Sequence, residues 1–478
     1  MELLLRADGD EALGTGHVMR CLSLAHAWRR FGTVALAARR LSPGLARRAE
    51  AAGVRVLEPS DAFDDRAGLT ALAQERGAAA VVLDGYHLPA ELQDMRAVPL
   101  LVLDDHGRWA RSPPAVLDGN LAATPQTYPN SAVLSGPRYA LLGPAFPPTP
   151  ASPQRDVLVT LGGRAEPRLL RVVLAAVRGF RATLVLGTTQ EDVAEITAEA
   201  EAEGIDVRHD VQNMADLMAR HRIGIIAAGT TALEAAACGL PLLALAQADN
   251  QVPVLAALED AGVGKSLGSA HDVHAETLRH EVTLALQSPS WLESAKKAGP
   301  NLVDGRGARR VAAWIRSQCA HVRSVNDGDR DMVLTWANDP GTRANSFQSD
   351  VIQPEEHARW WAAKAHDPGA HLAIVEADGP LGFVWFSVRG EAATISVNMA
   401  PSRRGQGWGA AVIRAGCDWL FGRREAREIL AWVRPENQAS RAVFLDAGFE
   451  EQAACHEHEV PFDGAVLFKL KPGPELRP

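Results

Sequence analysis

The stretch Gly14-Thr15-Gly16-His17-Val18-Met19-Arg20 decides how the beginning of this chain folds. An apolar run, Leu3-Leu4-Leu5, precedes it, and an apolar helical pattern that begins at Cys21 follows it. This order predicts a strand, a glycine turn and the start of a helix. Such a turn directs backbone N–H groups at whatever lies above it, and a histidine there can act as a general base. The alternative is a tight turn whose histidine only caps the helix.

Strand and helix patterns alternate through residues 1–145 and predict a parallel sheet that is covered on both faces. The predicted strands are Glu2–Arg6, Thr33–Ala37, Arg55–Leu57, Ala79–Leu83 and Leu100–Leu103. Polar residues follow two of these strands, at Asp84–His87 and at Asp104–His106. Ligands of open α/β sheets bind beyond the carboxyl ends of the strands. We therefore expect both groups of residues to face the same crevice as His17.

A second α/β unit follows the proline-rich segment 144–153, which we interpret as a linker. Its predicted strands are Asp156–Thr160, Ala182–Gly187, Ile223–Ala228 and Leu240–Leu245. Glycine turns follow two of them, at Leu161–Arg164 and at Gly229–Glu234. The glycine and hydroxyl groups of the second turn open a helix, where phosphate binds well. Glu234 could accept hydrogen bonds from a ribose, or it could merely complement the helix dipole.

The character of the chain changes at about residue 321, where tryptophans become frequent. Neighbouring strands at His371–Glu376, Leu381–Val388 and Ala393–Met399 predict an antiparallel meander. We therefore predict two tandem Rossmann-type α/β domains followed by a smaller α+β domain. The predicted boundaries are 1–145, 146–318 and 319–473.

Composition excludes several classes of protein. The 478 residues carry a formal net charge of -9 and contain no long basic run, which argues against a nucleic-acid partner. The five cysteines are scattered without a C-x-x-C pair, so neither a disulfide framework nor a cysteine-based zinc site is expected. No signal peptide or membrane-spanning stretch is evident, and we expect a cytoplasmic chain without a membrane partner. The sequence does not indicate an oligomeric state.

Nine segments, in order, resemble the UDP-2,4-diacetamido-2,4,6-trideoxy-β-L-altropyranose hydrolases of pseudaminic acid biosynthesis. They are Arg6–Leu22, Asp84–Tyr86, Leu103–Asp105, Gly136–Leu142, Leu161–Gly163, Met214–Met218, Ala228–Glu234, Gly239–Pro241 and Ala248–Gln251. The resemblance covers roughly residues 1–315. The later segments are also similar to the GT-B glycosyltransferase that adds N-acetylglucosamine to lipid I. The sequence departs from the hydrolase pattern at Thr160-Leu161 and at Arg164–Pro167.

The resemblance implies a GT-B-like pair of domains with UDP in the cleft and hydrolysis without a metal. It implies that His17 activates the water that attacks the anomeric carbon. Tyr86 and Asn250 would hold the sugar, and Glu234 would hold the uridine ribose. The other implied substrate-binding residues are Gly14, Gly16, Arg20, Gly229, Thr230, Thr231 and Gln251, whose glycines let the backbone approach the diphosphate.

A second set of motifs lies near the end of the chain. Arg404-Gly405-Gln406-Gly407-Trp408-Gly409 has the form R-x-x-G-x-G and follows a predicted strand, so its N–H groups can hold a pyrophosphate at a helix start. The segment Asn437-x-x-Ser440-x-x-x-Phe444 places its three residues along one side of a helix. Together these motifs resemble the acetyl-CoA signatures of the GNAT N-acetyltransferases.

This resemblance implies acetyl-CoA as the cofactor, with its pantetheine arm against a splayed strand pair. Arg404, Gly405, Gly407 and Gly409 would bind the CoA diphosphate. The remaining implied cofactor-binding residues are Met399, Asn437, Ser440 and Phe444. Many such enzymes have a tyrosine at the position of Phe444, where it protonates the leaving thiolate. Phenylalanine has no such proton.

The segments Leu334–Arg343 and Glu355–Trp360 resemble the acetyltransferase that precedes the hydrolase in the same pathway. That enzyme acetylates the 4-amino group of a UDP-linked 4-amino-4,6-dideoxy sugar. His357 then lies near the acceptor or is structural, and Trp336, Trp360 and Trp361 are core residues or walls of the acceptor pocket.

Three hypotheses remain open from the sequence. The first is a bifunctional enzyme that acetylates a UDP-linked amino sugar and hydrolyses the UDP-linked diacetamido sugar. The second is a GT-B glycosyltransferase with an accessory acetyltransferase. The third is a sugar-nucleotide-binding protein with a degenerate acetyltransferase.

Overall fold

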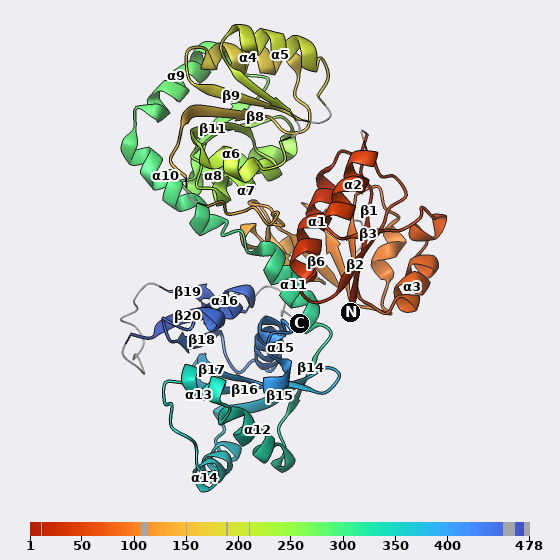
Figure 1. The fold of residues 1–478 in the computed structure, drawn as a ribbon, viewed down its shortest axis with the longest axis vertical. Helices are drawn as coiled ribbons and strands as arrows, with labels where there is room; N and C mark the ends of the chain where they lie inside the picture. The colour runs from red at the N-terminus through yellow and green to blue at the C-terminus, as the bar shows by residue number, and fades with distance from the viewer. Residues whose placement is uncertain are drawn as a thin grey trace.

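The computed structural model describes residues 1–10, 12–105, 107, 113–149, 151–187, 190–209, 211–452 and 464–472. These residues form three sheets, each covered by helices, that follow one another along the chain (Figure 1). The first two sheets are parallel throughout, and the third is mixed. The predicted fold class, two Rossmann-type units followed by an α+β unit, is confirmed.

The first sheet has the order β3-β2-β1-β4-β5-β6-β7. Its strands are β1 (Glu2–Ala7), β2 (Thr33–Ala37), β3 (Arg55–Val56), β4 (Ala78–Asp84), β5 (Leu100–Leu103), β6 (Ala115–Asp118) and β7 (Ala132–Ser135). Its helices are α1 (Gly16–Trp28), α2 (Pro43–Ala51) and α3 (Arg66–Glu75). Leu3, Leu4 and Leu5 are fully buried, which explains the continuous apolar run of a strand covered on both faces. The strand order reverses between β1 and β4, and that is where ligands of such sheets bind.

The second sheet has the order β10-β9-β8-β11-β12-β13. Its strands are β8 (Arg155–Thr160), β9 (Ala182–Leu186), β10 (Asp206–His209), β11 (His221–Ala227), β12 (Leu242–Ala246) and β13 (Gly264–Ser269). Its helices are α4 (Pro167–Val177), α5 (Val193–Ala202), α6 (Met214–Ala219), α7 (Thr230–Ala237), α8 (Val252–Asp260), α9 (Ala275–Leu286) and α10 (Pro289–Leu302). Here the order reverses between β8 and β11, so the glycine turn before α7 lies at the second switch point.

The third sheet has the order β14-β15-β16-β17-β18-β20-β19. Its strands are β14 (His321–Ser324), β15 (Ala370–Glu376), β16 (Pro380–Arg389), β17 (Ala392–Met399), β18 (Glu428–Val433), β19 (Glu450–Glu451) and β20 (Val466–Leu470). Its helices are α12 (Arg330–Ala337), α13 (Pro340–Asn345), α14 (Pro354–Ala365), α15 (Gly409–Gly422) and α16 (Gln438–Asp446). The predicted meander is confirmed, because β15, β16 and β17 pair antiparallel in that order.

Strands β17 and β18 are parallel but pair over only three residues each, Ala392–Thr394 with Glu428–Leu430. β17 continues to Met399 and β18 to Val433, so the two strands separate toward their carboxyl ends. This separation is the splay that the GNAT resemblance implies.

Helix α11 (Gly307–Ser317) joins the first and third units. It packs against α1 on one side and α15 on the other, and Figure 1 shows it at the junction of the two units. Val311, Ala312 and Ile315 belong to the core of the first unit, whereas Ala313 belongs to the core of the third. The helix therefore contributes to two hydrophobic cores at once.

A second contact ties the same units together. Arg138, in the segment 136–142 that follows β7, donates hydrogen bonds to the carbonyls of Gly448 and Phe449, at 3.2 Å each, and forms an ion pair with Glu450. Arg310 of α11 donates to the Arg138 carbonyl at 2.8 Å and to the Leu445 carbonyl at 3.1 Å. The third unit is thus fixed to the first by partly buried polar contacts as well as by apolar packing.

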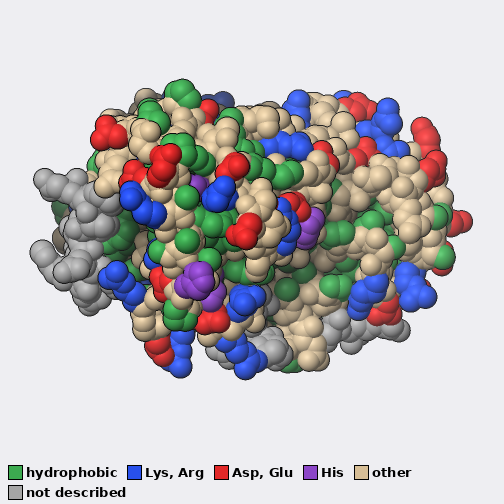
Figure 2. Space-filling view, turned by 90° about the horizontal axis from the view of Figure 1, so that it is seen from below, with side chains coloured by type: hydrophobic (Ala, Val, Ile, Leu, Met, Phe, Trp, Pro, Cys, Tyr) green, Lys and Arg blue, Asp and Glu red, His purple; other side chains and the backbone are tan. Residues whose placement is uncertain are grey.

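The described residues on the molecular face drawn in Figure 2 form no large patch of only acidic or only basic side chains. Acidic and basic side chains are interspersed there with hydrophobic ones (Figure 2). None of the helices in the described parts of the chain is long and apolar enough to cross a bilayer.

Candidate active sites

The first helix begins at Gly16, before the predicted start at Cys21, so His17 lies in the first turn of α1. Its Nδ1 atom lies 2.6 Å from Oδ1 of Asp84, a fully buried residue at the end of β4. Arg20 Nη2 also lies 3.2 Å from Nδ1, but the shorter contact with an oxygen that can only accept assigns the proton to Nδ1. Nε2 then keeps its lone pair and can accept a proton from water.

Arg20 follows His17 by one turn of the same helix and holds two carboxylates. Its Nη2 donates to Asp84 at 2.7 Å, and its Nη1 donates to both oxygens of Asp105, at 2.9 and 2.7 Å. Burial alone would lower the pKa of Arg20, but the charges of Asp84 and Asp105 outweigh it and raise that pKa. Arg20 therefore remains a cation and fixes the carboxylate that orients His17.

Tyr86 completes this cluster at the end of β4. Its hydroxyl donates to Oδ2 of Asp105 at 2.5 Å, and its ring packs edge-on against the His17 imidazole with 5.4 Å between centroids. Burial, followed by the charge of Asp105, raises the pKa of Tyr86. The phenol therefore stays protonated and acts as a hydrogen-bond donor.

A cavity of about 190 Å³ lies between the first and second units, beside this cluster. Arg20 and Tyr86 line it from one side, and the turn before α7 lines it from the other. Of the sequence-predicted site residues, the cavity brings together Arg20, Tyr86, Gly229, Thr230, Asn250 and Gln251. Its wall also contains Asp105, which we expected in this crevice, and Tyr139–Leu142, which lie in one of the segments that resemble the hydrolases. Gly119 and Asn120, also in the wall, were not singled out from the sequence. Asn120 follows β6, a strand of only four residues that the periodicity did not reveal.

The predicted base His17 and the glycines before it do not line the cavity themselves. His17 contacts two of the residues in its wall, Arg20 and Tyr86. Gly14 lies in the turn before α1 and Gly16 is the first residue of the helix, and a Cβ atom at either would meet no atom within 4 Å. The backbone of this turn is therefore open to a close approach.

Thr231 and Glu234 lie on α7, one turn apart. Burial raises the pKa of Glu234 to about 7, and no hydrogen bond to its carboxyl group is present within the described chain. A desolvated carboxyl group without a partner is suited to accept hydrogen bonds from ligand hydroxyls.

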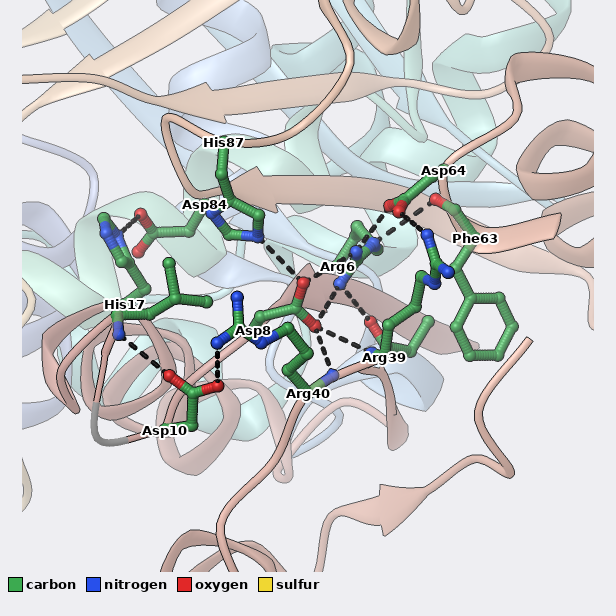
Figure 3. A network of polar contacts seen from close by, with 12 residues as sticks. Arg6, Asp8, Asp10, His17, Arg39, Arg40, Phe63, Asp64, Asp84 and His87 are labelled. Atoms are coloured by element: carbon green, nitrogen blue, oxygen red, sulfur yellow. Dashed lines mark hydrogen bonds and ion pairs between the residues drawn. The ribbon is translucent and has the colours of Figure 1, made fainter. Parts of the chain in front are cut away.

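A second charged cluster holds the loop that leads into α1. Arg6 is fully buried and donates to Asp8 at 2.7 and 2.9 Å and to Asp64 at 2.5 Å. His87 binds Asp8, with 2.8 Å between Nε2 and Oδ2, so it faces this cluster and His17 faces Asp84 (Figure 3). His106, which we expected in the same crevice, lies outside the described residues. The cluster fixes the backbone that presents His17.

The glycine-rich loop of the third unit opens α15, as the motif predicts. Gly405 and Gly407 have φ of +72° and +73°, a conformation that favours glycine, and Gly409 is the first residue of the helix. Arg404 forms an ion pair with Asp339 and donates to Thr342 at 2.6 Å, so its guanidinium holds the start of α13. Open N–H groups at a helix start, next to a splayed strand pair, fit the diphosphate and pantetheine of CoA.

The remaining predicted CoA residues have structural partners. Asn437 caps α16 by accepting a hydrogen bond from the Ser440 amide at 3.0 Å. Phe444 is buried against Phe449, with 5.0 Å between ring centroids. Met399 ends β17, at the mouth of the splay.

His357 is buried on α14, with its ring stacked on Trp360 at 5.5 Å between centroids. Burial, assisted by the charge of Arg330, lowers the pKa of His357. Trp361 and Trp336 are buried in the same hydrophobic cluster, whereas Trp360 is only partly buried. The described residues contain no cluster of three or more His, Cys, Asp or Glu side chains that could hold a metal ion.

Parts of the chain are similar to known proteins. Residues 321–450 match a family model described as an acetyltransferase (GNAT) domain. The chain is 27% identical over 248 residues to the spore coat polysaccharide biosynthesis protein SpsG of Bacillus subtilis, a match that covers 48% of this chain and 73% of the relative. It is 20% identical over 403 residues to an uncharacterized protein, MJ1062, of Methanocaldococcus jannaschii, covering 76% of this chain and 78% of that one. A solved structure of the glycotransferase of kitacinnamycin aligns with a TM-score of 0.49 and 16% identity, over 66% of this chain and 98% of its own.

The third unit is therefore a GNAT acetyltransferase domain, and acetyl-CoA, the predicted cofactor, is the acetyl donor that fits it. About half of the chain is similar to a protein of spore coat polysaccharide biosynthesis. The chain combines a sugar-biosynthesis-like region with an acetyltransferase domain.

Proposed function

We propose that the chain is a bifunctional nucleotide-sugar enzyme. The first two units hydrolyse UDP-2,4-diacetamido-2,4,6-trideoxy-β-L-altropyranose to the free sugar and UDP. The third unit N-acetylates the 4-amino group of the UDP-4-amino-4,6-dideoxy-sugar precursor. The observation that carries the hydrolase is the pair His17–Asp84, held beside a cavity between two Rossmann-type units.

The proposed hydrolysis follows from the geometry of this pair. Nε2 of His17 takes a proton from water while the water oxygen attacks the anomeric carbon. The bond between that carbon and the diphosphate oxygen breaks, and its electron pair leaves with UDP. Asp84 accepts the hydrogen bond from Nδ1 and stabilises the imidazolium that forms, in the manner of a catalytic triad.

The second unit supplies the environment for the leaving group. Gly229 and Thr230 expose the start of α7 to the cavity, where N–H groups and the helix dipole stabilise the negative charge on the diphosphate. Asn250 and Tyr86 lie on opposite sides of the cavity. Asn250 can donate its amide N–H to the sugar, and the Tyr86 hydroxyl, whose own proton goes to Asp105, can accept a hydrogen bond from it. Glu234 is proposed to accept from the uridine ribose.

In the third unit, acetyl-CoA supplies the acetyl group as a thioester. The glycine loop and the start of α15 hold the diphosphate, and the splayed β17 and β18 leave backbone groups for the pantetheine. Because Phe444 has no proton to give, water or another group protonates the thiolate, and we expect slow acetyl transfer.

The experiment is incubation of the purified chain with the UDP-linked diacetamido sugar, followed by chromatography of free UDP. We expect UDP release without an added sugar acceptor, and a loss of about 10²- to 10⁴-fold in rate for His17→Ala. His26→Ala removes an exposed histidine from the same helix and serves as the matched control.

Two results would contradict the proposal. UDP release that requires a sugar acceptor would indicate a glycosyltransferase, and full hydrolysis by His17→Ala would exclude the proposed base. A parallel incubation with acetyl-CoA and the 4-amino sugar nucleotide, read by mass spectrometry, tests the acetyl transfer independently.

A further inference from the structure

Arg316, near the end of α11, is a buried cation that has no counter-ion among the described residues. It is 4% exposed, and its Nε and Nη1 atoms have no hydrogen-bond partner in the described parts of the chain. Its guanidinium lies 3.8 Å from the ring centroid of Trp408 and 4.5 Å from that of Phe31. Burial lowers the pKa of Arg316 to about 10. An uncompensated buried charge destabilises a fold, and unsatisfied N–H groups of this kind often serve a ligand.

This cation lies directly behind the glycine loop of the acetyltransferase domain. Nη1 of Arg316 is 3.3 Å from the position that a Cβ atom would take at Gly407, and Phe31 is 2.3 Å from that position. Trp408, on which the guanidinium stacks, is the residue that precedes the first turn of α15. A positive charge therefore lies next to N–H groups that are already arranged for an anion.

The arginine of the loop itself is engaged elsewhere. Arg404 is paired with Asp339 and Thr342, so part of its charge is already neutralised. Arg316 forms no ion pair within the described residues, although the more distant Asp378 acts on its charge. Of the two arginines near the loop, Arg316 therefore has more N–H groups left to donate to an anion.

We propose that Arg316 is a binding residue for the diphosphate of CoA, contributed from outside the residues that match the acetyltransferase family and held in place by Phe31 of the first unit. This inference rests on the proposed acetyl-CoA site. Phe31 lies just beyond the end of α1, the helix whose first turn carries His17. The CoA site is therefore completed only where the first and third units are joined.

The test is calorimetric titration of CoA into the full-length chain and into Arg316→Met. A lost hydrogen bond to a charged group corresponds to a rise of about 10- to 100-fold in Kd, which we expect for the variant. Replacing an unpaired buried charge by an apolar side chain of similar size is often neutral or stabilising. The melting temperature of Arg316→Met is therefore expected to equal or exceed that of the wild type.

Pantetheine, which lacks the diphosphate, separates a binding role from a structural one. Arg316→Met should weaken CoA and leave the Kd for pantetheine unchanged, even if the variant is less stable. Arg30→Met, which removes the more exposed arginine 4.9 Å from the Phe31 centroid, is the matched control and should bind CoA within about twofold of the wild type.

Equal affinities of wild type and Arg316→Met for CoA would overturn the inference and leave the acetyl-CoA site intact. An equal loss for CoA and pantetheine would also overturn it, because it would show a general disturbance of the domain. Absence of CoA binding by the wild type would refute the acetyl-CoA site, and the inference with it.

Discussion

Asp84 is the residue on which the proposed hydrolase geometry depends. Asn at this position could donate its amide N–H to Nδ1 of His17 and so favour the tautomer that carries its proton on Nε2. We expect Asp84→Asn to lower kcat for UDP release by about 10²- to 10⁴-fold, with a much smaller change in the affinity for UDP. Stopped assays of UDP release and calorimetry with UDP measure the two quantities separately.

The control for this prediction is a double variant, which tests whether the rate losses of the two substitutions add. If Asp84 acts through His17, the double variant His17→Ala/Asp84→Asn is no slower than His17→Ala alone. A further large loss in the double variant would show that Asp84 acts by another route, for example by holding Arg20.

Glu234 makes stability depend on pH. Its pKa rises from 4.5 in the unfolded chain to about 7 in the folded one. The protonated folded state is therefore favoured at low pH, and this stability is lost as the pH rises from 4.5 through 7. Glu234→Gln should be more stable than the wild type at pH 8, by on the order of 3 kcal/mol, and the difference should close toward pH 4.5.

Melting curves of both proteins across this pH range test the prediction, with Glu259→Gln on the exposed side of α8 as the control for loss of one charge. A constant difference between Glu234→Gln and wild type at all pH values would contradict it. Weaker UDP binding by Glu234→Gln would separately support contact with the ribose.

At the residue scale, the sequence predicted which polar side chains meet in the candidate site, because strand ends and glycine turns position them locally. Asp84 and Asp105 meet Arg20, and Asp84 meets His17, because parallel strands end at one edge of the sheet. Arg316 could not be predicted, since its environment comes from Phe31 and Trp408, which are distant in the chain.

At the scale of elements, the loop before α15 offers a comparison between two glycines. Both Gly405 and Gly407 have positive φ, but only Gly407 has no room for a Cβ, because Phe31 occupies that space. Gly405→Ala should therefore carry only the cost of a left-handed alanine, about 1–2 kcal/mol. Gly407→Ala should also push Phe31 away and lower the melting temperature further. Thermal melts of the two variants measure the difference.

Phe31→Ala provides the control for the clash. It should restore part of the stability that Gly407→Ala loses and none of the stability that Gly405→Ala loses. If Phe31→Ala changed the stability of Gly405→Ala and of Gly407→Ala equally, Phe31 would not be the cause of the extra loss at Gly407.

Most strands of the first two sheets were predicted from the sequence, including the short β3 and β5, but β6 and β7 were not. The apolar runs of β1, β4, β8 and β11 are long enough to show strands. β6 and β7 have four residues each, like the predicted β5, but they lie between irregular segments, so no alternation of strand and helix patterns marks them. The helical pattern at Ala308–Gln318 predicts helix α11, but it does not show that Arg310 and Arg316 are both buried.

At the scale of the whole molecule, the junction at α11 is a stable interface. Residues 1–318 and 319–478, expressed together as separate chains, should remain associated, because the contact of α11 with α15 is apolar and Arg138 and Arg310 add buried hydrogen bonds. Co-purification through a tag on either chain measures this. Ala313→Glu, which places a charge in the core of the third unit, should separate them.

Elution of the unaltered halves as two independent species would contradict this prediction.

The number of units and the class of each sheet could be predicted from the sequence, because they follow from local patterns. The packing of the third unit against the first could not be predicted from the sequence, because hydrophobic periodicity does not indicate which surfaces of two units contact each other.

The double role of α11 constrains how such a protein can be recombined. A crossover placed just after residue 318 delivers the acetyltransferase without the helix that covers α15, and so exposes an apolar surface. A graft that begins instead at the helix carries Arg310 and Arg316 into a new host, which must then offer its own aromatic ring and carbonyl groups to receive them. Exchange of the acetyltransferase unit between proteins therefore requires compensating changes on both sides of the junction.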